Sequence, residues 1–472
     1  MYGMGIKDVV REFLRFRGGI VGIFLLLIIV GMALGAPLIS DEEAGNRWYD
    51  LEYWVEKDLP KGVPPAWVGV FEGRSYSVTE RFPGQIPETN RFILRTNITY
   101  NMKYDVPPSD VVIRVRIAEE ANISATTTYF VRLNVYRPDG TVIERVLDLE
   151  TVNRDLKISL KSEDRSRNAI ISFMKDFDEE GYERIINQGL TEVIDVIYIL
   201  FSQTGEGALL ERTEPLKGIY TFELEIIRTD INLELDSLEL LAMGAAHGVF
   251  GTDTNGRDIF VGIVWGARVA LILGLIVAIV SVLIGVLYGT VSAYLGGWVD
   301  EILQRIQEFA ISIPLLPLLL ILAFYFKPTI WNLILLLIVF SWPGPVKTIR
   351  SMALQIREQL YITAAKAVGA STGRIVLRYI FPQILPYTFA LVAFAVPGAI
   401  LTEAGVSFLL GAQGVLEITW GRILSDAQDA SAVLTGMWWW VLPPGFMIAI
   451  SGLAFVLIGT ALDRVLNPRL LR

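Results

Sequence analysis

Long apolar segments without a charged side chain alternate with polar segments along this chain. A helix needs about 20 apolar residues to cross the hydrocarbon core of a bilayer. Six segments approach or exceed that length: residues 18–40, 269–299, 309–326, 328–346, 379–402 and 430–462. A buried helix of a soluble protein is an alternative for a single short segment but not for six of them. The pattern therefore predicts six membrane-spanning helices.

The first apolar segment follows a basic leader between Lys7 and Arg17. A cleaved signal peptide is the alternative interpretation, because small residues near Ala36 resemble a cleavage site. The apolar run exceeds the usual hydrophobic region of a signal peptide, which is about 7–15 residues long. We therefore expect residues 1–39 to form a cytoplasmic N-terminus and a retained first transmembrane helix.

Residues 40–248 have a different pattern, typical of a folded domain outside the membrane. Four segments read as strands: Val111–Ile117, Tyr129–Val135, Val142–Val146 and Ile219–Ile227. An Asp139-Gly140 turn precedes the third, which indicates a hairpin. Apolar residues recur at helical spacing over Ala169–Phe201. We expect a β-rich, sandwich-like domain with an inserted helical segment.

Charge orients the predicted spans, because loops that stay in the cytoplasm carry an excess of Lys and Arg. The loop 347–378 has six basic residues and only Glu358 as an acidic one. It is therefore expected in the cytoplasm, with both termini, and residues 40–248 are expected outside the cell. Residues 296–308 are mildly acidic although this topology also places them inside.

Composition excludes several functional classes. Hydrophobic residues make up 53% of the chain and charged residues 19%. The segment 40–250 has a net charge of −14 and the rest +5, so a nucleic-acid partner, which needs a basic face, is excluded. The chain has no cysteine and one histidine, His247, so no thiolate chemistry and no histidine cluster for a metal is available.

The basic loop contains a helix-turn-helix pattern. Tyr361–Val368 lacks a helix breaker and ends at Gly369, a residue suited to the left-handed position that follows a helix. Ser371 can cap a second helix, which we expect to run to a boundary at Pro382. The pattern predicts either a rigid basic hairpin that transmits motion or an ordinary cytosolic loop, and the physics of the residues does not separate the two.

This stretch resembles the EAA loop of ABC importer permeases, which reads Glu-Ala-Ala, three residues, Gly, nine residues, then Ile-x-Leu-Pro. Thr363-Ala364-Ala365, Gly369 and Tyr379–Pro382 occupy these positions at the same spacing. Thr363 replaces the family's Glu and Tyr379 replaces its Ile. The resemblance implies that the loop 347–382 couples to ATPase subunits. The implied coupling residues are Thr363, Ala364, Ala365, Gly369, Ala370, Ser371 and Pro382.

Other motifs resemble the peptide/nickel-type permeases, and in particular the "C" member of the permease pair. They are Gly251–Asp258 with Gly266–Arg268, Leu401–Leu409, Trp420–Arg422 and Gly459–Arg469. The resemblance implies that residues 249–472 form a type I permease core with transmembrane helices 2–6. It does not extend to the insertion at 40–248.

Taken with the resemblance, the expected function is that of a multi-pass cell-membrane subunit forming half of an import pathway for peptides or oligosaccharides. Implied partners are a second permease, two ATPases that bind ATP and Mg, and an external solute-binding protein. This chain has no GxxxxGK[ST] phosphate loop, so it is expected to be no enzyme and to hold no cofactor. A membrane-anchored receptor or adhesin is the alternative. A secondary transporter is disfavoured, because the six apolar segments contain no ionisable relay.

Candidate pathway or permease–permease interface residues are Glu403, Ser407 and Phe408. An ionisable residue at the end of a span faces protein or water, so Glu403 either lines the pathway or interface or reaches the outer surface. Trp438-Trp439-Trp440 opens the last span and is expected to form an interfacial aromatic belt, with sugar stacking as the alternative. Arg257 and Asp258 are expected to form an exposed ion pair.

Overall fold

The computed structural model describes residues 11–86, 92–118, 128–210, 213–230, 234–326, 329–410 and 417–466. They form two compact units. The helical unit contains the residues up to Asp50 and from Ile259 onward, and the β unit contains Leu51–Asp258. The expected boundaries of the inserted domain, 40 and 248, therefore lie about ten residues before those of the β unit. The reason is visible at Gly45, which packs against the Trp265 side chain of the helical unit.

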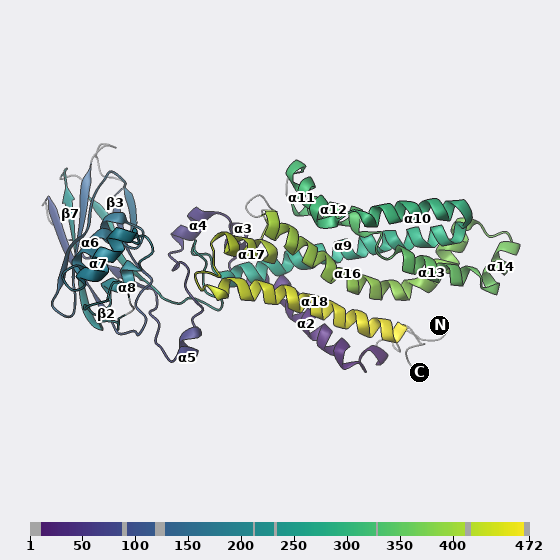
Figure 1. Ribbon diagram of the computed structural model, residues 1–472, viewed down its shortest axis with the longest axis horizontal. Coiled ribbons are helices and arrows are strands. Elements are labelled where there is room, and N and C mark those ends of the chain that lie inside the picture. The colour runs from purple at the N-terminus through teal and green to yellow at the C-terminus, as the bar shows by residue number, and fades with distance from the viewer. Residues whose placement is uncertain are drawn as a thin grey trace. The chain divides into compact units, whose positions relative to one another are not determined.

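The helical unit is built from long apolar helices (Figure 1). Four helical stretches of the described chain are long and apolar enough to cross a membrane: 17–39, 259–295, 372–410 and 438–465. They contain α2 (Arg17–Ile39), α9 (Ile259–Leu295), α16 (Phe381–Leu410) and α18 (Trp438–Leu466). The expected helical membrane core is confirmed.

The two shortest predicted spans fall where the helices bend. The helix α10 (Gly297–Ser312) meets α11 (Leu315–Tyr325) at 73°, and α12 (Ile330–Ser341) meets α13 (Val346–Arg357) at 49°. Pro314 lies at the first break and Pro343 at the second, and a proline interrupts helical hydrogen bonding. If each bent pair is one span, the described residues hold six, so the number six stays a prediction.

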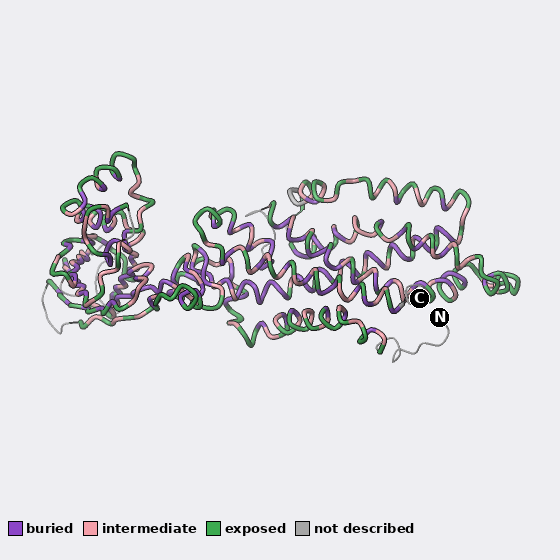
Figure 2. The backbone as a smooth tube through the Cα atoms, turned by 60° about the horizontal axis from the view of Figure 1, so that its bottom comes forward, coloured by how far each residue is buried: buried purple, intermediate pink, exposed green. Residues whose placement is uncertain are grey.

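The helix α9 is central to the helical unit and contacts α2, α12, α13, α16 and α17. The shorter helices α3 (Glu42–Asn46) and α17 (Trp420–Asp429) complete this unit, apart from the hairpin described below. Figure 2 shows α2 largely exposed along its length. Its exposed side chains include Phe24 and Leu34. An apolar helix face that no protein covers suits a lipid environment.

The β unit contains two antiparallel four-stranded sheets within its described residues. One sheet has the order β1-β8-β3-β6 and the other β2-β7-β4-β5. The strands are β1 Glu80–Pro83, β2 Ile93–Met102, β3 Asp110–Ile117, β4 Tyr129–Tyr136, β5 Val142–Thr151, β6 Asp155–Ser159, β7 Gly218–Arg228 and β8 Leu235–Met243. Both sheets contribute to one apolar core, which includes Tyr100, Ile113 and Phe222. The β-rich domain is confirmed, and its classification as a sandwich stays a prediction.

The inserted helical segment consists of three short helices. They are α6 (Asp164–Met174), α7 (Glu179–Gln188) and α8 (Val196–Leu200). Asp178 starts α7 by accepting a hydrogen bond from the Gly181 amide, and Gly189 ends it in the left-handed conformation. The helical spacing over residues 169–201 was therefore interpreted correctly. The N-cap at Asp178 and the left-handed Gly189 divide the segment into separate helices.

The two remaining helices of the β unit, α4 (Leu51–Glu56) and α5 (Val68–Glu72), precede the strands in the chain. All four predicted strands are present, and the turn before β5 is confirmed: the Gly140 amide donates to the Arg137 carbonyl at 3.1 Å. The strands β1, β2, β6 and β8 were not predicted. Of these, β2 carried a readable signal, because its residues alternate between exposed and buried.

Candidate functional site

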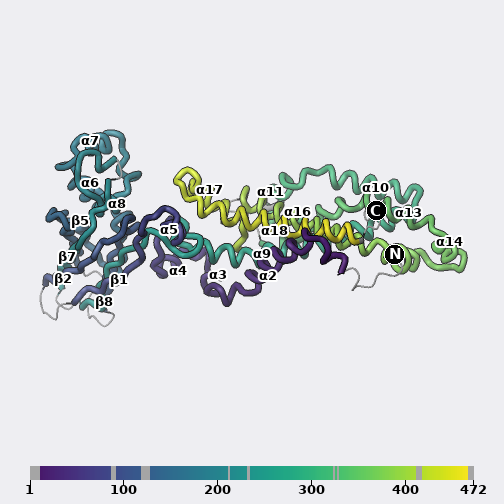
Figure 3. The backbone as a smooth tube through the Cα atoms, turned by 90° about the horizontal axis from the view of Figure 1, so that it is seen from below, coloured from purple at the N-terminus to yellow at the C-terminus, as the bar shows by residue number. Residues whose placement is uncertain are grey.

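The predicted hairpin lies at one end of the helical unit, and α17 lies at the other (Figures 1 and 3). It is formed by α14 (Leu360–Ala367), α15 (Thr372–Ile375) and a π-helical turn, η1 (Val376–Ile380), which continues into α16. We call residues 360–380 the hairpin. It joins α13 to the long apolar helix α16.

Gly369 ends α14 as the sequence predicts. Its φ is +84°, a left-handed conformation that glycine adopts without steric cost. The Gly369 amide donates to the Lys366 carbonyl and the Ala370 amide donates to the Ala365 carbonyl, both at 3.0 Å. These two bonds form a Schellman motif, which satisfies carbonyls left free at the helix end. The turn is therefore built by backbone geometry.

One face of the hairpin is buried and the other is exposed. Ile362, Ile375 and Ile380 are fully buried in an apolar cluster with residues of α9 and α13. The predicted coupling residues lie away from this cluster. Thr363, Ala364, Gly369, Ser371 and Pro382 are exposed, and Ala365 and Ala370 are partly exposed. The buried face thus fixes the hairpin on α9 and α13, while the predicted coupling residues on the other face stay accessible.

Two local expectations about the second half of the hairpin were wrong. The helix does not end at Pro382, because the helical path runs through residues 372–410 without a break. The π-helical turn just before it, in which the Phe381 amide donates to the Val376 carbonyl five residues back, widens the helix and relieves the clash that a proline ring makes with the preceding turn. Ser371 occupies the N-cap position of α15, but its side chain makes no capping bond.

A polar network joins α13, the helix that precedes the hairpin, to α10 and α9. The Arg350 guanidinium of α13 donates to both carboxylate oxygens of Asp300, and its Nη2–Oδ2 distance is 2.5 Å. The Lys347 ammonium lies 3.2 Å from the Glu308 carboxylate, and Arg357 donates to the Ala293 carbonyl at 2.8 Å. These pairs explain the acidic residues of segment 296–308, which neutralise cations of the basic loop. No pattern in the sequence predicts the pairing of Asp300 with Arg350, which lies 50 residues further along the chain.

Two further motifs meet at the opposite end, where α17 packs against α9 and α16. The Trp420 indole donates to the Ile263 carbonyl at 3.0 Å. A Cβ added at Gly421 would lie 2.5 Å from the Ala404 Cα atom, so only glycine permits this close approach. The motifs Leu401–Leu409 and Trp420–Arg422 therefore hold α16 and α17 together.

Glu403 and Ser407 are buried inside this junction, with 3% and 0% exposure. The Ser407 hydroxyl donates to the Glu403 carboxylate at 2.7 Å. Glu403 therefore does not reach the outer surface, and in this conformation neither residue lines an open path. Phe408 is 38% exposed and lines a pocket with Leu424 of α17.

The aromatic belt expected at Trp438–Trp440 was wrong for two of its three members. Trp439 and Trp440 are buried in the helical unit and only Trp438 is substantially exposed. The other two rings pack inside the helical unit, and their position in the sequence does not reveal this packing. The same burial removes them from a sugar-stacking surface.

The loop Gly251–Asp258 belongs to the β unit. The Asp253 carboxylate accepts bonds from the Asn255 and Arg257 amides at 2.9 and 2.8 Å and from the Arg257 side chain. Arg257 is 3% exposed, so the expectation that it is exposed was wrong, and its ion pair with Asp258 stays a prediction. The Asp258 carboxylate also lies 3.6 Å from the His247 ring. The Asp253 carboxylate is buried, and burying a carboxylate without hydrogen-bond partners would cost folding free energy. Its hydrogen bonds to the loop therefore fix the conformation of the loop.

The described residues contain no group of three or more His, Cys, Asp or Glu side chains that could hold a metal ion. The hairpin presents an exposed surface on a buried apolar support.

Comparisons with known proteins identify relatives of this chain. A family model described as "binding-protein-dependent transport system inner membrane component" matches residues 281–472. The dipeptide transport system permease protein DppC of Bacillus subtilis is 36% identical over 224 residues, 47% of this chain and 69% of that protein. The oligopeptide permease protein OppC of the same organism is 33% identical over 222 residues, 47% of this chain and 72% of that protein. A DppC protein of Alkalihalophilus pseudofirmus is 33% identical over 227 residues, covering 48% and 73%.

Proposed function

The chain belongs to the family of binding-protein-dependent inner-membrane transport components, as a C-type permease of peptide ABC importers, and from this membership we propose that it forms half of a peptide translocation pathway driven by partner ATPases. The observation that carries the proposal is the hairpin. It is exposed where the family's coupling loop contacts another subunit, and buried where it meets α9 and α13.

In the proposed mechanism, two ATPase subunits bind ATP and Mg and close on each other. Their surfaces hold the exposed side of the hairpin around Thr363, Ala364 and Gly369. Because the hairpin continues into α16 without a break, its displacement moves that helix and changes the access of the pathway. Thr363 lacks the carboxylate of the family's Glu, so contact there uses a hydroxyl in place of a charge.

We place the hairpin and both termini in the cytoplasm and the β unit outside the cell. The basic excess of loop 347–378 supports this orientation. The acidic side chains of segment 296–308 do not weigh against it, since Asp300 and Glu308 pair with Arg350 and Lys347. We count each bent helix pair as one span, which gives six, and classify the β unit as a sandwich.

The chain acts with a second homologous permease, two ATPases and an external solute-binding protein, and with no nucleic acid. Phe408 and its pocket lie on the surface that we assign to the second permease, with Glu403 and Ser407 supporting it from inside. The chain itself is non-catalytic and holds no cofactor. A receptor or adhesin role is not favoured, since it gives the exposed hairpin no task.

The experiment is reconstitution of the chain with its sister permease and ATPases in proteoliposomes. Uptake of labelled di- and oligopeptides is measured with ATP and the binding protein, with labelled oligosaccharides as the comparison solute. We expect ATP-dependent peptide uptake by the full complex and no ATP hydrolysis by the isolated chain. ATPase activity in the isolated chain, or uptake that is independent of ATP, would overturn the proposal.

A further inference from the structure

Two segments of the β unit that lack Asp, Glu, Lys and Arg, residues 62–71 and 240–252, lie side by side. The Ala66 amide donates to the Gly248 carbonyl at 3.0 Å, and a second backbone bond of 2.9 Å also joins the two segments. Segment 40–250 as a whole has a net charge of −14. The uncharged surface is therefore a local feature of an acidic domain.

The outer side of these two segments is apolar and exposed. Val70 and Phe71 of α5 are each 82% exposed, Val249 is 48% exposed and Trp67 is 41% exposed. The rings of Trp67 and Phe71 contact each other edge to face, with 5.7 Å between their centroids. The Trp67 indole donates to the Val249 carbonyl at 2.8 Å, which joins the two segments. We call these four residues the apolar patch. Exposed apolar surface that is contiguous marks sites of contact with protein or membrane.

The patch has a folded support, because the inner side of α5 is packed. Val68, in the middle of the patch sequence, is buried. A Cβ added at Gly69 would lie 2.7 Å from the Arg74 carbonyl oxygen, so only glycine permits this approach. The exposed side chains therefore extend from a helix whose other side is tightly packed.

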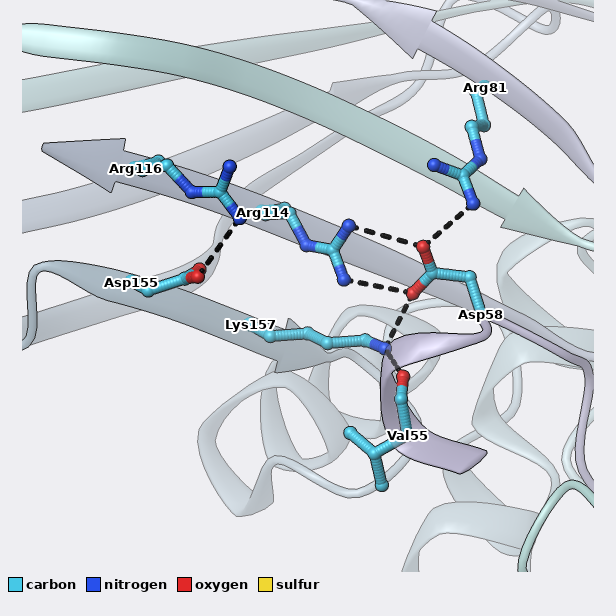
Figure 4. Close-up of polar contacts among 7 residues, drawn as sticks. All are labelled: Val55, Asp58, Arg81, Arg114, Arg116, Asp155 and Lys157. Carbon is cyan, nitrogen blue, oxygen red and sulfur yellow. Dashed lines mark hydrogen bonds and ion pairs between the residues drawn. The ribbon is translucent and has the colours of Figure 1, made fainter. Parts of the chain in front are cut away.

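The chain before the patch is fixed on the sheet β1-β8-β3-β6 by Asp58 (Figure 4). This residue is 4% exposed. The Arg114 guanidinium donates to both of its carboxylate oxygens at 3.0 and 3.1 Å, the Arg81 guanidinium lies at 2.9 Å and the Lys157 ammonium at 2.6 Å. These cations come from β3, β1 and β6, so one anion joins three strands to the segment that leads into α5. The patch is thus supported from the sheet as well as from residues 240–252.

The patch is close in the chain to a membrane-spanning helix. Val249 is ten residues before Ile259, where α9 begins. Ten residues of chain extend over at most about 33–36 Å. Thr252 and Asp258 form an antiparallel bridge, so the loop between them closes on itself and the reach of the chain is shorter still. The apolar patch is therefore tethered to a helix that lies in the bilayer.

We propose that the apolar patch is a membrane-interface anchor: the Trp67, Val70 and Phe71 side chains insert among the headgroups and upper acyl chains of the leaflet on the side of the β unit. Trp favours this boundary, because its ring is apolar and its N–H is polar. The indole N–H is already bonded to the Val249 carbonyl, so the ring leaves water without an unpaired donor. This inference goes beyond the proposed function and needs only a chain that spans the membrane.

A bilayer is the occupant that the chain itself supplies. A surface tethered to a spanning helix meets the lipid at a high effective concentration, so an insertion too weak to hold a free domain suffices here. A patch of four side chains fits that requirement. Insertion of apolar side chains gains free energy from the apolar area that leaves water, and it does not require attraction to anionic headgroups, which an acidic domain would oppose.

Site-specific labelling tests the proposal, because the chain has no cysteine. Val70→Cys carries a fluorophore on the patch. Val193→Cys is the matched control, since it replaces the same residue type in the same unit and Val193 is 80% exposed. The labelled full chain is reconstituted into liposomes of phosphatidylcholine and phosphatidylglycerol, with or without bromine on the acyl chains. We expect bromine to quench the Val70 label at least about threefold more strongly than the Val193 label, because an inserted apolar face lies about 5–10 Å into the boundary between headgroups and acyl chains.

A second variant tests which side chains anchor the surface. With the label on Val249→Cys, the double substitution Val70→Asp and Phe71→Asp puts two charges in the patch, and we expect quenching to fall about threefold or more, since charged side chains are costly in lipid. Val193→Asp with the same label leaves quenching unchanged. Val70 and Phe71 are both 82% exposed, so the thermal unfolding midpoint is expected to stay near that of the parent chain, which checks that the double variant still folds.

Equal quenching of the Val70 and Val193 labels overturns the proposal, as does quenching of the Val249 label that the double substitution leaves unchanged. A Val70 label that bromine does not quench, and whose emission changes only when a solute-binding protein is added, identifies a protein-docking surface and also overturns the membrane anchor. Failure of the proposed function is recognised separately, by a complex without ATP-driven uptake, because the labelling measurements use this chain alone.

Discussion

The conformation of Gly369 gives the sharpest test of the hairpin. At a φ of +84°, a residue with a Cβ atom pays about 1–2 kcal/mol relative to glycine. A Cβ added at Gly369 meets no atom within 4 Å. The whole cost of a substitution is therefore conformational and none of it is a clash. A loss of 1–2 kcal/mol lowers the population of a local structure by a factor of about 5–30.

The expected order of ATP-driven uptake follows from this cost. Gly369→Asn stays near wild type, because Asn tolerates the left-handed region. Gly369→Ala loses activity, and Gly369→Val loses most, because a β-branched residue is an outlier there. Uptake is measured in proteoliposomes and divided by the amount of assembled complex. Gly373→Ala is the matched control, since it lies in the same hairpin with open space around its Cβ position and no positive φ.

Two results would refute the reasoning. If Gly369→Asn lowers uptake as much as Gly369→Val, then uptake depends on the absence of a side chain at this surface and not on the backbone conformation. If all three variants transport at the wild-type rate, the Schellman turn is not needed for coupling. Equal loss in Gly373→Ala would show that the hairpin surface tolerates no added atoms.

Two further predictions concern stability. Gly421→Ala places a Cβ atom within 2.5 Å of the Ala404 backbone, so we expect the thermal unfolding midpoint in detergent to fall, with a loss of about 1–3 kcal/mol in the free energy of unfolding. The control is Gly398→Ala in α16, where an added Cβ meets no atom within 4 Å and the free energy of unfolding changes by less than about 1 kcal/mol. An equal loss in Gly398→Ala would contradict the steric argument. The bonds to Lys217 and to the Ser75 amide and hydroxyl hold the pKa of the exposed Asp105 carboxyl well below its usual range. A folded-state pKa below the unfolded value contributes stability that is present above the unfolded pKa and is lost as pH falls through the folded pKa. The difference in unfolding midpoint between wild type and Asp105→Asn is therefore expected at pH 7 and shrinks under strongly acidic conditions; a difference that is independent of pH would contradict it.

The sequence by itself determined the features that depend on neighbouring residues. The length of the segments without charged side chains predicted the long helices, because a helix needs about 20 apolar residues to cross a bilayer. The Gly369 turn was predicted from one residue, since few others adopt a positive φ. Period-two alternation predicted β3, β4 and β7, and β2 followed the same rule although it was not predicted. The family was recognised because its motifs are short and keep their spacing.

Only the tertiary structure decided which faces meet. Glu403, Trp439 and Trp440 stand in apolar surroundings in the sequence, but their burial depends on helices that are distant along the chain. Pro382 was interpreted as a boundary by a local rule, which the π-helical turn overrides. Pairs such as Asp300–Arg350 and Asp58–Arg114 join residues about 50 positions apart. A charged residue in a sequence does not reveal its partner, because that partner is fixed by strand register and helix packing, which arise only when the whole chain folds.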